Sequence, residues 1–459
     1  MASNINEYLK LSTLSNVITD IKNKSFQADV VILAGGFGTR LISEIGTNTP
    51  KPMAEINGMP LLEHQIRLCK KYQFNKILIL VHHLSEIIID YFKDGSNFGV
   101  EIHYSYENNP RGTAGAILDS VNKLEDQFLV IYGDTYLDVD LRKFFNSKGT
   151  EEVLTFCHPN SHPYDSDLLK LDTNDMVTNV FRPSKSGEKL YKNLVNAALY
   201  ALDKEIFLSF VSIEKPMDIS SELFPILLKN NKRIKAYKSV EYIRDMGTPD
   251  RLKSVCKSVQ DGTVSLLSLS NKRRCVFIDR DGVINKEKGH ISNINDFEIL
   301  PRVSKAISLL NNSGFLVICI TNQPVIARGE LSFKGLSDIH MKMEAELGKD
   351  GAYLDDIFFC PHHPHSGFEG EVLELKFDCE CRKPKPGLII QAIKKYNIDS
   401  NSSWMVGDHS RDIQCGLNAG LSVAFIGNTK SNQKSNTTTK CFDDLFAVCE
   451  FILKEPNNI

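Results

Sequence analysis

The chain has 459 residues, which is more than one hydrophobic core usually organises, so two large domains are expected. With 42% hydrophobic residues, 24% charged residues and a net charge of −3, it has no broadly basic surface of the kind that binds nucleic acid. No apolar run approaches the ~20 residues that span a bilayer, and the N-terminus lacks a secretory pattern, so we expect a cytoplasmic protein with neither a membrane nor a nucleic-acid partner.

Residues 1–27 are polar and form an extension without a chemical motif. From Ala28, short apolar strands alternate with amphipathic helices, which predicts a mostly parallel sheet covered by helices. The expected strands of this first series are Asp29–Ala34, Lys76–Val81, Gln127–Tyr132 and Glu152–Cys157.

A second α/β series follows a stretch rich in Ser, Lys and Gly. Its expected strands are Cys275–Ile278, Phe315–Thr321, Asp356–Cys360, Trp404–Val406 and Ser422–Ile426. The pattern predicts an α/β protein with one domain at 28–253, a linker at 254–271 and a second domain at 272–459.

The first strand runs into a glycine-rich loop that contains Gly35, Gly36, Gly38, Thr39 and Arg40. Glycines after a buried strand bring backbone N–H groups close to a base or phosphate, and the guanidinium of Arg40 suits phosphate oxygens. On its own, such a loop is equally consistent with a structural turn.

Lys51 follows between Pro50 and Pro52, which should hold it in an extended segment as a point charge for a phosphate. If this motif stood alone, a solvated loop lysine would be the simpler interpretation.

Three further features belong to the first half. Gly112 and Thr113 open a small-residue helix that a ligand can approach closely. Asp134 comes directly after an apolar strand, where α/β sheets place ligand and metal groups, and Asp245 could complete a Mg²⁺ site with it. Either aspartate alone is more often a cap or a turn former.

The ordered set from Gly35 to Pro249 resembles the sugar-1-phosphate nucleotidyltransferases, and especially the enzymes that activate heptose 1-phosphate. The resemblance implies a Rossmann-like sheet, with Arg40 and Lys51 on the nucleotide phosphates and Asp134 and Asp245 on Mg²⁺. Tyr132 and Ala198 depart from it, since the family often has Asn and Gly there, and the extra methyl of Ala198 is expected to shift the bound sugar.

In the second half, Asp279 and Asp281 follow a strand with one residue between them. Such a pair can divide its roles, with one carboxylate attacking phosphorus while the other protonates the leaving oxygen and then activates water. A bare Asp-x-Asp is also common in turns.

Further polar groups follow in the same half. In chain order they are a hydroxyl, two amides, two cations and a carboxylate, supplied by Thr321, Asn322, Gln323, Arg382, Lys383 and Asp408. This order resembles the haloacid-dehalogenase-type phosphatases. The resemblance implies Asp279 as nucleophile, Asp281 as general acid and base, Thr321 and Lys383 as phosphate holders, and Mg²⁺ held by Asp279, Asp408 and Asp281, the last through its backbone carbonyl. Asp412 is either a further ligand or a helix N-terminal charge.

Most of the eleven cysteines stand singly in apolar segments, but Cys360, His362, Cys379 and Cys381 form a cluster. Three thiolates and an imidazole make a closed tetrahedral set of the kind that binds structural Zn²⁺. The alternative is a group of reduced surface cysteines. His363 and His365 could substitute as ligands but are expected to be exposed.

The second half resembles the D-glycero-D-manno-heptose 1,7-bisphosphate phosphatases and their relatives that act on histidinol phosphate. Where that family often has Ser-Gly, this chain has Pro324-Val325, which is expected to narrow the pocket or to change the preferred anomer.

A phosphatase that strips the distal phosphate from a sugar bisphosphate makes the sugar 1-phosphate that a nucleotidyltransferase needs, whereas histidinol phosphate yields nothing for it. We therefore expect removal of the 7-phosphate of heptose 1,7-bisphosphate, then nucleotidyl transfer from an NTP, with GTP favoured by family analogy, for surface polysaccharide. The alternatives are another sugar phosphate, or one half acting as a binding module without catalysis.

Overall fold

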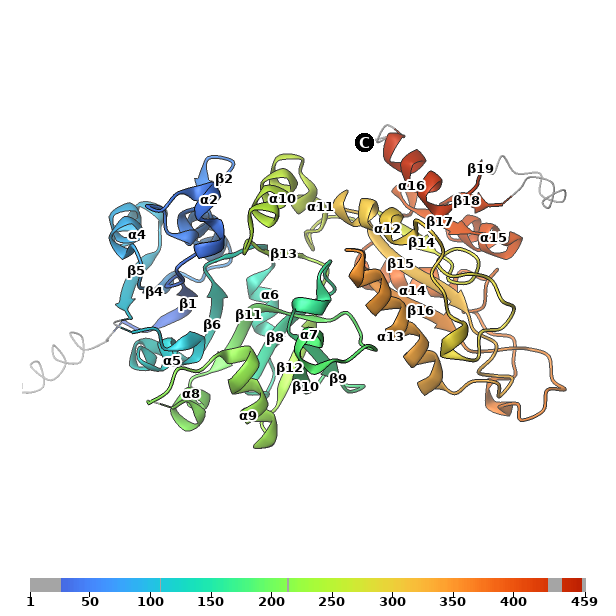
Figure 1. The fold of residues 1–459 in the computed structure, drawn as a ribbon, viewed down its shortest axis with the longest axis horizontal. Helices are drawn as coiled ribbons and strands as arrows, with labels where there is room; N and C mark the ends of the chain where they lie inside the picture. Colours follow the sequence, from blue (N-terminus) through green and yellow to red (C-terminus); the bar gives the residue numbers. More distant parts are fainter. Residues whose placement is uncertain (1–25, 108, 213, 428–439, 456–459) are drawn as a thin grey trace, which may run out of the picture.

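The computed structural model describes residues 26–107, 109–212, 214–427 and 440–455, so the N-terminal extension lies almost wholly outside the described residues. These residues form two α/β halves joined through helices α10 (Pro249–Gln260) and α11 (Thr263–Leu266), with the first half in blue to green and the second in yellow to red (Figure 1). No helix within these ranges is long and apolar enough to cross a membrane.

The first half is built on one large mixed sheet. Its strands are β1 (Ala28–Leu33), β4 (Lys76–Val81), β5 (Glu101–Tyr106), β6 (Leu124–Tyr132), β8 (Val153–His158), β9 (Leu168–Leu171), β10 (Val177–Phe181), β11 (Val195–Asp203) and β12 (Ile234–Lys238). Neighbours run β10-β9-β11-β6-β1-β4-β5, with β8 and β12 attached beside β11. β1 is parallel to β4 and β6, whereas β11 is antiparallel to β6 and β8.

Helices cover this sheet on both faces, which explains why its central strands are apolar without interruption. The helices are α2 (Ile42–Ile45), α3 (Leu61–Lys71), α4 (Ser85–Phe92), α5 (Gly112–Leu118), α6 (Leu141–Asn146), α7 (Pro183–Ser186), α8 (Glu205–Phe210) and α9 (Phe224–Lys229). Along β1, Val31 packs into one core, whereas Val30 and Ile32 pack into the other. Since alternate side chains of a strand point to opposite faces, both sets must be apolar.

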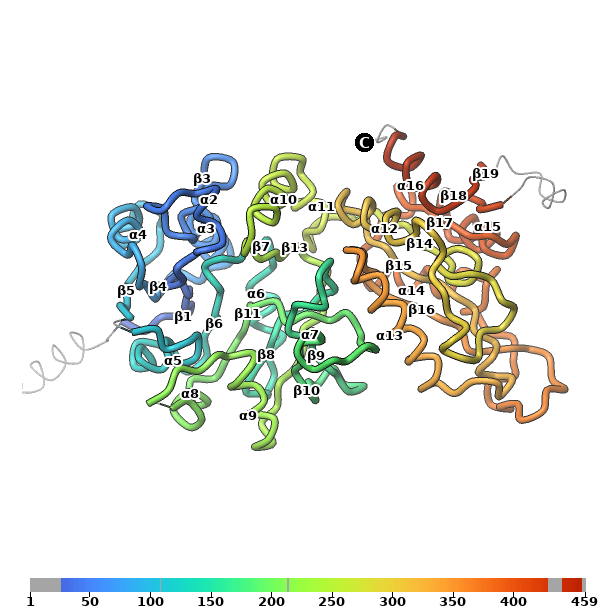
Figure 2. Tube along the Cα trace, viewed as in Figure 1, coloured from blue at the N-terminus to red at the C-terminus, as the bar shows by residue number. Residues whose placement is uncertain are grey.

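Two short ribbons lie outside the main sheet. β2 (Glu55–Ile56) pairs with β3 (Met59–Pro60). β7 (Thr135–Asp138), which directly follows β6, pairs antiparallel with β13 (Tyr242–Asp245), and the chain trace shows the two side by side (Figure 2). This β7–β13 ribbon joins segments more than a hundred residues apart.

The second half contains a parallel sheet in the order β16-β15-β14-β17-β18-β19. Its strands are β14 (Cys275–Ile278), β15 (Leu316–Asn322), β16 (Asp356–Cys360), β17 (Trp404–Gly407), β18 (Ser422–Ile426) and β19 (Lys440–Phe442). Its helices are α12 (Val303–Asn312), α13 (Phe333–Lys349), α14 (Gly387–Tyr396), α15 (Ser410–Asn418) and α16 (Leu445–Lys454). The α/β prediction is therefore confirmed for both halves.

The segment expected to be a linker contains the end of α10 and all of α11. Its apolar residues Val255, Val264 and Leu267 pack into a core that also takes in Tyr242 of the first half and Phe277 of the second. The two halves are thus joined by packed helices rather than by a loose tether. The domain boundaries expected from the sequence, 28–253 and 272–459, stay predictions.

Candidate active sites

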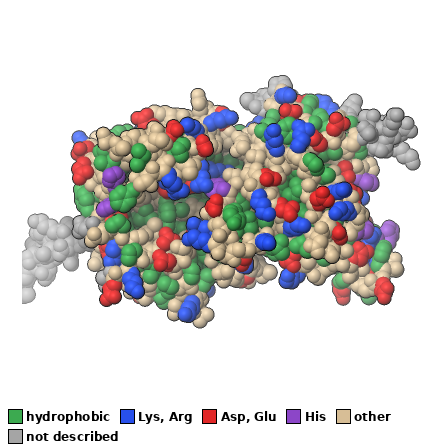
Figure 3. Space-filling model, viewed as in Figure 1, with side chains coloured by type: hydrophobic (Ala, Val, Ile, Leu, Met, Phe, Trp, Pro, Cys, Tyr) green, Lys and Arg blue, Asp and Glu red, His purple; other side chains and the backbone are tan. Residues whose placement is uncertain are grey.

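The first site lies where two neighbouring parallel strands end. Leu33 at the end of β1 is in register with Tyr132 at the end of β6, and the Gly133 amide donates to the Leu33 carbonyl at 2.9 Å. The loops that follow these strands therefore meet at one edge of the sheet, around a cavity of about 460 Å³. This cavity is lined by the expected residues Gly35, Gly36, Gly38, Thr39, Arg40, Lys51, Gly112, Thr113 and Asp134. The surface of the first half is hollowed beside a group of Lys and Arg side chains (Figure 3).

Gly38 shows why this loop needs glycine. Its φ of 63° is left-handed, and a Cβ there would lie 3.0 Å from the Cβ of Lys51. Glycine therefore lets the loop turn against Lys51 and leaves its backbone open toward the cavity, while the exposed side chain of Arg40 lines the same cavity.

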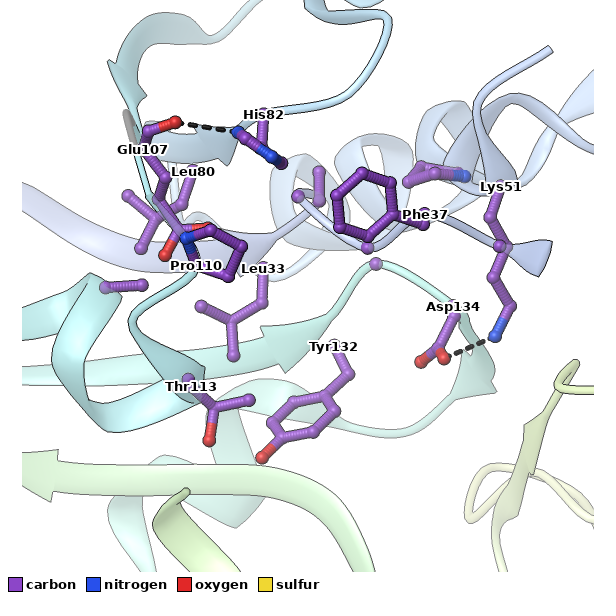
Figure 4. A pocket seen from close by; sticks show the side chains of 18 of the residues that line it. Leu33, Phe37, Lys51, Leu80, His82, Glu107, Pro110, Thr113, Tyr132 and Asp134 are labelled. Atoms are coloured by element: carbon purple, nitrogen blue, oxygen red, sulfur yellow. Dashed lines mark hydrogen bonds and ion pairs between the residues drawn. The ribbon is translucent and has the colours of Figure 1, made fainter. Parts of the chain in front are cut away.

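Lys51 is 8% exposed and points into the cavity, where its Nζ lies 2.5 Å from Oδ2 of Asp134 (Figure 4). The expectation of an extended segment here is wrong. Residues Lys51–Met53 form a 3₁₀ turn, because the Met53 amide donates to the Pro50 carbonyl and the Ala54 amide to the Lys51 carbonyl. The turn fixes Lys51 more firmly than an extended strand would.

The β7–β13 ribbon brings the two expected metal ligands together. Asp245 is opposite Thr135, and the Met246 amide donates to the Asp134 carbonyl at 2.9 Å. Asp134 lines the cavity, whereas Asp245 does not line it but lies beside Gly247, which does. Carboxylates are ligands that Mg²⁺ prefers, so the assignment of this pair to the ion stays a prediction.

Two residues that the sequence did not single out hold Asp245. Its Oδ1 accepts from Arg251 at 2.6 Å and its Oδ2 lies 3.5 Å from Nε2 of His162. Burial opposes ionisation, but the hydrogen bonds from His162 and Arg251, together with the charge of Arg251, hold the pKa of Asp245 well below its ordinary value. The position of Arg251 at the start of α10, where Thr248 caps the helix, could have been a signal.

Other side chains line the deeper part of the cavity. The Thr113 hydroxyl donates to Asp218 Oδ2 at 2.9 Å and accepts from the Ile219 amide, so it is engaged within the protein. Glu107 and His82, which the sequence did not single out, also line the cavity, and the His82 ring bonds the Glu107 carbonyl at 2.7 Å (Figure 4). Burial raises the pKa of the Glu107 carboxyl, and a Cβ on Gly35 would lie 2.8 Å from Glu107 Oε2.

Ala198 of β11 adopts the left-handed backbone conformation that favours glycine, the residue that the family often has at this position. Its φ is 57°, in a stretch of β11 where the register with β8 shifts. A side chain in this conformation is strained, by about 1–2 kcal/mol.

The second site is built in the same way, at the carboxyl ends of neighbouring strands. Asp279 follows β14, Thr321 lies near the end of β15 and Asp408 follows β17, and β14 pairs with both neighbours in parallel. Lys383 enters from a loop, and its Nζ lies 2.7 Å from Asp279 Oδ1 and 2.8 Å from Asp412 Oδ1.

The charges at this centre are almost fully buried. Burial raises the pKa of the Asp279 carboxyl, and the Lys383 ammonium opposes that effect. Burial disfavours the charged form of Lys383, yet the carboxylates of Asp279 and Asp412 raise its pKa above the ordinary value. Lys383 is thus held between the carboxylates of Asp279, the expected nucleophile, and Asp412.

Oxygens of Asp279, Asp408 and Asp412 lie within 4.8 Å of one another, a set that could hold a metal ion. Asp412 is fully buried and its carboxylate accepts from the His409 amide at the start of α15, which supports the helix N-terminal role; its role as a metal ligand stays a prediction. Gly282, with a φ of 79°, lies beside Asp408. Glycine is needed at this position because a Cβ there would overlap the Asp408 carboxylate. Three oxygen ligands fit Mg²⁺.

The Asp281 carboxylate lies outside this set. It accepts from Arg280 at 2.9 Å, from Asn285 at 3.1 Å and from Gln323 at 2.9 Å. Burial acts to raise its pKa, but Arg280 and the other donors lower it. The side chain is thus held as a carboxylate beside Arg280.

The two amides expected to hold phosphate are engaged inside the site. Asn322 accepts from the Lys383 amide at 3.0 Å and donates to its carbonyl at 3.2 Å, which clamps the backbone that carries this lysine. Gln323 donates to both Asp281 and the hydroxyl of Thr321.

Val325 is 1% exposed and packs with Ile326 and Leu336. The residue that replaces the usual glycine therefore points into the protein, so the expected narrowing of the pocket by its side chain is wrong. A branched apolar side chain is better buried than left at a polar pocket.

The cysteine cluster assembles as expected. The Sγ atoms of Cys360, Cys379 and Cys381 lie 3.2–3.5 Å from one another, and His362 Nδ1 lies 3.2 Å from Cys381 Sγ. A tetrahedral site with bonds of ~2.3 Å has edges of roughly 3.7 Å, so these four groups could bind a metal after a small expansion. Arg382 donates to the His362 carbonyl at 3.2 Å, which links the cluster to the loop of Lys383.

His363 is 6% exposed, which corrects the expectation that it is exposed, and its Nε2 lies 3.1 Å from Arg328. It packs under the loop and is held by Arg328, so it is not one of the four ligands. His365 is exposed as expected.

Comparison with known proteins agrees with this geometry. Residues 29–262 match the family model described as nucleotidyl transferase, and residues 380–446 match the one described as HAD-hydrolase-like. A D-glycero-alpha-D-manno-heptose-1,7-bisphosphate 7-phosphatase of Photorhabdus laumondii is 40% identical over 185 residues, covering 40% of this chain and 98% of that protein. The D-glycero-beta-D-manno-heptose-1,7-bisphosphate 7-phosphatase of Escherichia coli is 36% identical over 154 residues, covering 34% of this chain and 78% of that protein.

Solved structures resemble each half separately. HddC from Yersinia pseudotuberculosis is 27% identical, with 51% of this chain and 100% of that chain covered and a TM-score of 0.43. The D,D-heptose 1,7-bisphosphate phosphatase from B. bronchiseptica, complexed with magnesium and phosphate, is 32% identical, with 40% and 99% covered and a TM-score of 0.36.

Proposed function

Because the chain belongs to the nucleotidyl transferase family through residues 29–262, and its second half belongs with the haloacid-dehalogenase-like phosphatases, we propose that it carries out two consecutive steps of heptose activation. The second site removes the 7-phosphate of D-glycero-D-manno-heptose 1,7-bisphosphate. The first site then transfers a nucleotidyl group from an NTP to heptose 1-phosphate and releases pyrophosphate, for surface polysaccharide. The observation that carries the proposal is the presence of both assembled sites in one chain, because one makes the kind of substrate that the other uses.

In the phosphatase step, an Asp279 oxygen attacks the phosphorus of the 7-phosphate, and the bond to the sugar oxygen breaks. Asp281 takes up a proton from solvent when it leaves Arg280 and gives this proton to the departing oxygen; the resulting carboxylate then removes a proton from the water that hydrolyses the aspartyl phosphate. Lys383, held between Asp279 and Asp412, neutralises the phosphate. Mg²⁺ at Asp279, Asp408 and Asp412 supplies further charge neutralisation when bound.

In the transferase step, an oxygen of the sugar 1-phosphate attacks the α-phosphorus of the NTP, and pyrophosphate leaves. No covalent protein group is needed, because such transfer depends on positioning and on charge neutralisation. Arg40 and Lys51 bind the phosphates from the rim and floor of the cavity. Asp134 and Asp245 would hold Mg²⁺, which would supply charge neutralisation for the phosphates.

We assign GTP as the nucleotide. Glu107 lies in the cavity at the end of β5, near the loop that carries Gly35. A carboxylate offers two acceptors side by side, which match the adjacent N1–H and N2–H donors of guanine, whereas adenine, uracil and cytosine do not present that pair.

We assign Zn²⁺ to Cys360, His362, Cys379 and Cys381. The set is closed and rich in sulfur, as structural zinc requires, and Arg382 couples it to the loop of Lys383. A reduced thiolate cluster and an NTP substrate both favour the cytoplasm as the place of action.

The test supplies the purified full chain with heptose 1,7-bisphosphate, Mg²⁺ and each NTP in turn, and follows phosphate, pyrophosphate and nucleotide-sugar by mass spectrometry. We expect phosphate release and then GDP-heptose. Asp279→Asn should stop phosphate release but still convert supplied heptose 1-phosphate, and Asp134→Ala should do the reverse. Absence of both products from the wild-type chain would refute the heptose assignment.

A further inference from the structure

The β7–β13 ribbon, which contains the expected metal ligand Asp245 and directly follows the other one, Asp134, touches the second half of the protein. Arg244 of β13 donates from Nη2 to the hydroxyl of Tyr353 at 2.7 Å. Its guanidinium carbon lies 5.6 Å from the ring centres of both Tyr242 and Tyr353, so the group is sandwiched between a ring from each half. A second nitrogen lies 3.4 Å from His158 Nδ1.

Tyr353 is well fixed to receive this bond. It is 8% exposed and lies between α13 and β16. Asn311 of α12 clamps its backbone from both sides, since its side chain accepts from the Tyr353 amide and donates to the Tyr353 carbonyl, each at 3.2 Å. Two residues later, Asp355 accepts from the Val317 amide of β15 at 2.7 Å. The hydroxyl is thus anchored to the sheet of the second half.

The surroundings of Arg244 are tightly packed. The cavity lined by Arg244, Tyr353 and Asn311 measures only about 20 Å³, enough for little more than one water molecule. A second contact lies nearby, where Pro163 packs so closely on α13 that a Cβ at Gly348 would overlap it. Pro163 follows His162, the residue beside Asp245.

Neighbouring residues of a strand point to opposite faces. Arg244 therefore reaches back to Tyr353, while the Asp245 carboxylate lies on the other side, with Arg251 and beside Gly247, which lines the cavity of the first site. A residue behind the ribbon can set the position of Asp245 without competing with a ligand.

We propose that Tyr353 of the phosphatase half is a positioning residue for nucleotidyl transfer, acting through Arg244 to hold Asp245 and Asp134 at the spacing that the metal–nucleotide complex requires. The inference rests on the proposed function of the first site. It makes the docked phosphatase half a structural part of the transferase, although that half contributes no group to the reacting atoms.

The test is Tyr353→Phe, which removes one hydroxyl and keeps the ring. We expect the Mg²⁺ concentration that gives the half-maximal transferase rate to rise roughly 5- to 10-fold, because a residue that holds a metal ligand in place is lost. The KM for heptose 1-phosphate should change less. Phosphatase kcat/KM should stay within about twofold, because Tyr353 lies at the amino end of β16, away from Asp279.

A readout independent of turnover is calorimetric binding of Mn²⁺ with a non-hydrolysable GTP analogue to chains carrying Asp279→Asn, which weakens the other metal site. Tyr353→Phe should weaken this binding by a similar factor. Arg244→Met should have the same effect, and the double variant should be no worse than either single one, since both remove one link.

Tyr396→Phe is the matched control, because its hydroxyl bonds Asp356 within the second half at 2.7 Å. The inference is overturned if Tyr353→Phe leaves both Mg²⁺ activation and Mn²⁺–nucleotide binding unchanged, or if Tyr396→Phe alters them equally. Failure of the proposed function is distinct, since the wild-type chain would then make no nucleotide-sugar at all.

Discussion

Lys51 and Asp134 form an ion pair of 2.5 Å at the floor of the first cavity, so the expected phosphate cation and the expected metal ligand neutralise each other across the place where a triphosphate would lie. A metal on Asp134 and a phosphate on Lys51 would each take one partner from this pair. Under the proposed function, the pair would keep both charges neutralised until the metal and the nucleotide bind.

Lys51→Met should lower transferase kcat by roughly 10²–10³-fold, because one aligned cation is lost where charge develops. Affinity for Mg²⁺ should not fall, since Asp134 no longer has a competing partner. Steady-state rates at several Mg²⁺ concentrations check both points. Lys71→Met is the control, because Lys71 pairs with Asp138 on the surface, at 3.8 Å. A kcat within threefold of the wild type would contradict the role of Lys51.

Glu107→Gln should erase the preference for guanine. The amide offers one acceptor and one donor, so its NH₂ would oppose a donor of the base, and kcat/KM for GTP should fall roughly 10²-fold or more. Rates with ATP and UTP should stay the same or rise. Competition between nucleotides in one reaction measures the ratio, and an unaltered GTP preference would show that another group recognises the base.

Removal of the cluster metal should damage the phosphatase half selectively. Cys379→Ser should lower the zinc content, measured by mass spectrometry of the metal, and reduce phosphatase activity, because the loop with Arg382 and Lys383 loses its support. Transferase activity should remain. Cys256→Ser, outside the cluster, should change none of these quantities. Full zinc content in the Cys379→Ser chain would exclude these four ligands.

Glu344 of α13 predicts a pH dependence of stability. It is 7% exposed, burial raises its pKa to about 7, and Lys192 of the first half and Asp356 are its charged neighbours. Since the folded pKa exceeds the unfolded value of about 4.5, its contribution is fully present below pH 4.5 and is lost as the pH rises through 7, by an amount on the order of 3 kcal/mol.

Glu344→Gln should therefore match the wild type in thermal unfolding at pH 5 and exceed it at pH 8. Glu346→Gln is the control, because Glu346 pairs with Lys342 on the same helix. Equal differences at both pH values would mean that Glu344 is ionised in the folded protein.

The sequence predicted the sheets well where a short, mainly apolar run ends at polar residues. The expected strands Lys76–Val81, Cys275–Ile278, Asp356–Cys360 and Ser422–Ile426 coincide with β4, β14, β16 and β18. The residues after such strands meet at one edge, which is why the motif positions assemble as they do.

The features that the sequence did not predict depend on contacts between residues far apart in the chain. The β7–β13 ribbon has two four-residue strands whose pairing a local pattern does not predict, and with it came Arg251 and His162 as partners of Asp245. The direction of the Asp281 side chain depends on Arg280, Asn285 and Gln323 converging from different loops. The burial of Val325 depends on packing against Leu336.

The first half docks at the amino ends of β15 and β16, near Asn311 and Tyr353, whereas Asp279 lies at the carboxyl end of the same sheet. The Arg244–Tyr353 contact and Asp279 therefore lie at opposite ends of the strands, which are separated by about the length of β15, roughly 20 Å. Under the proposed function the intermediate passes through the bulk solution and mixes with any pool outside. An added enzyme that consumes heptose 1-phosphate should therefore intercept the intermediate. The fusion would then fix the ratio of the two active sites at one to one without channelling the intermediate between them.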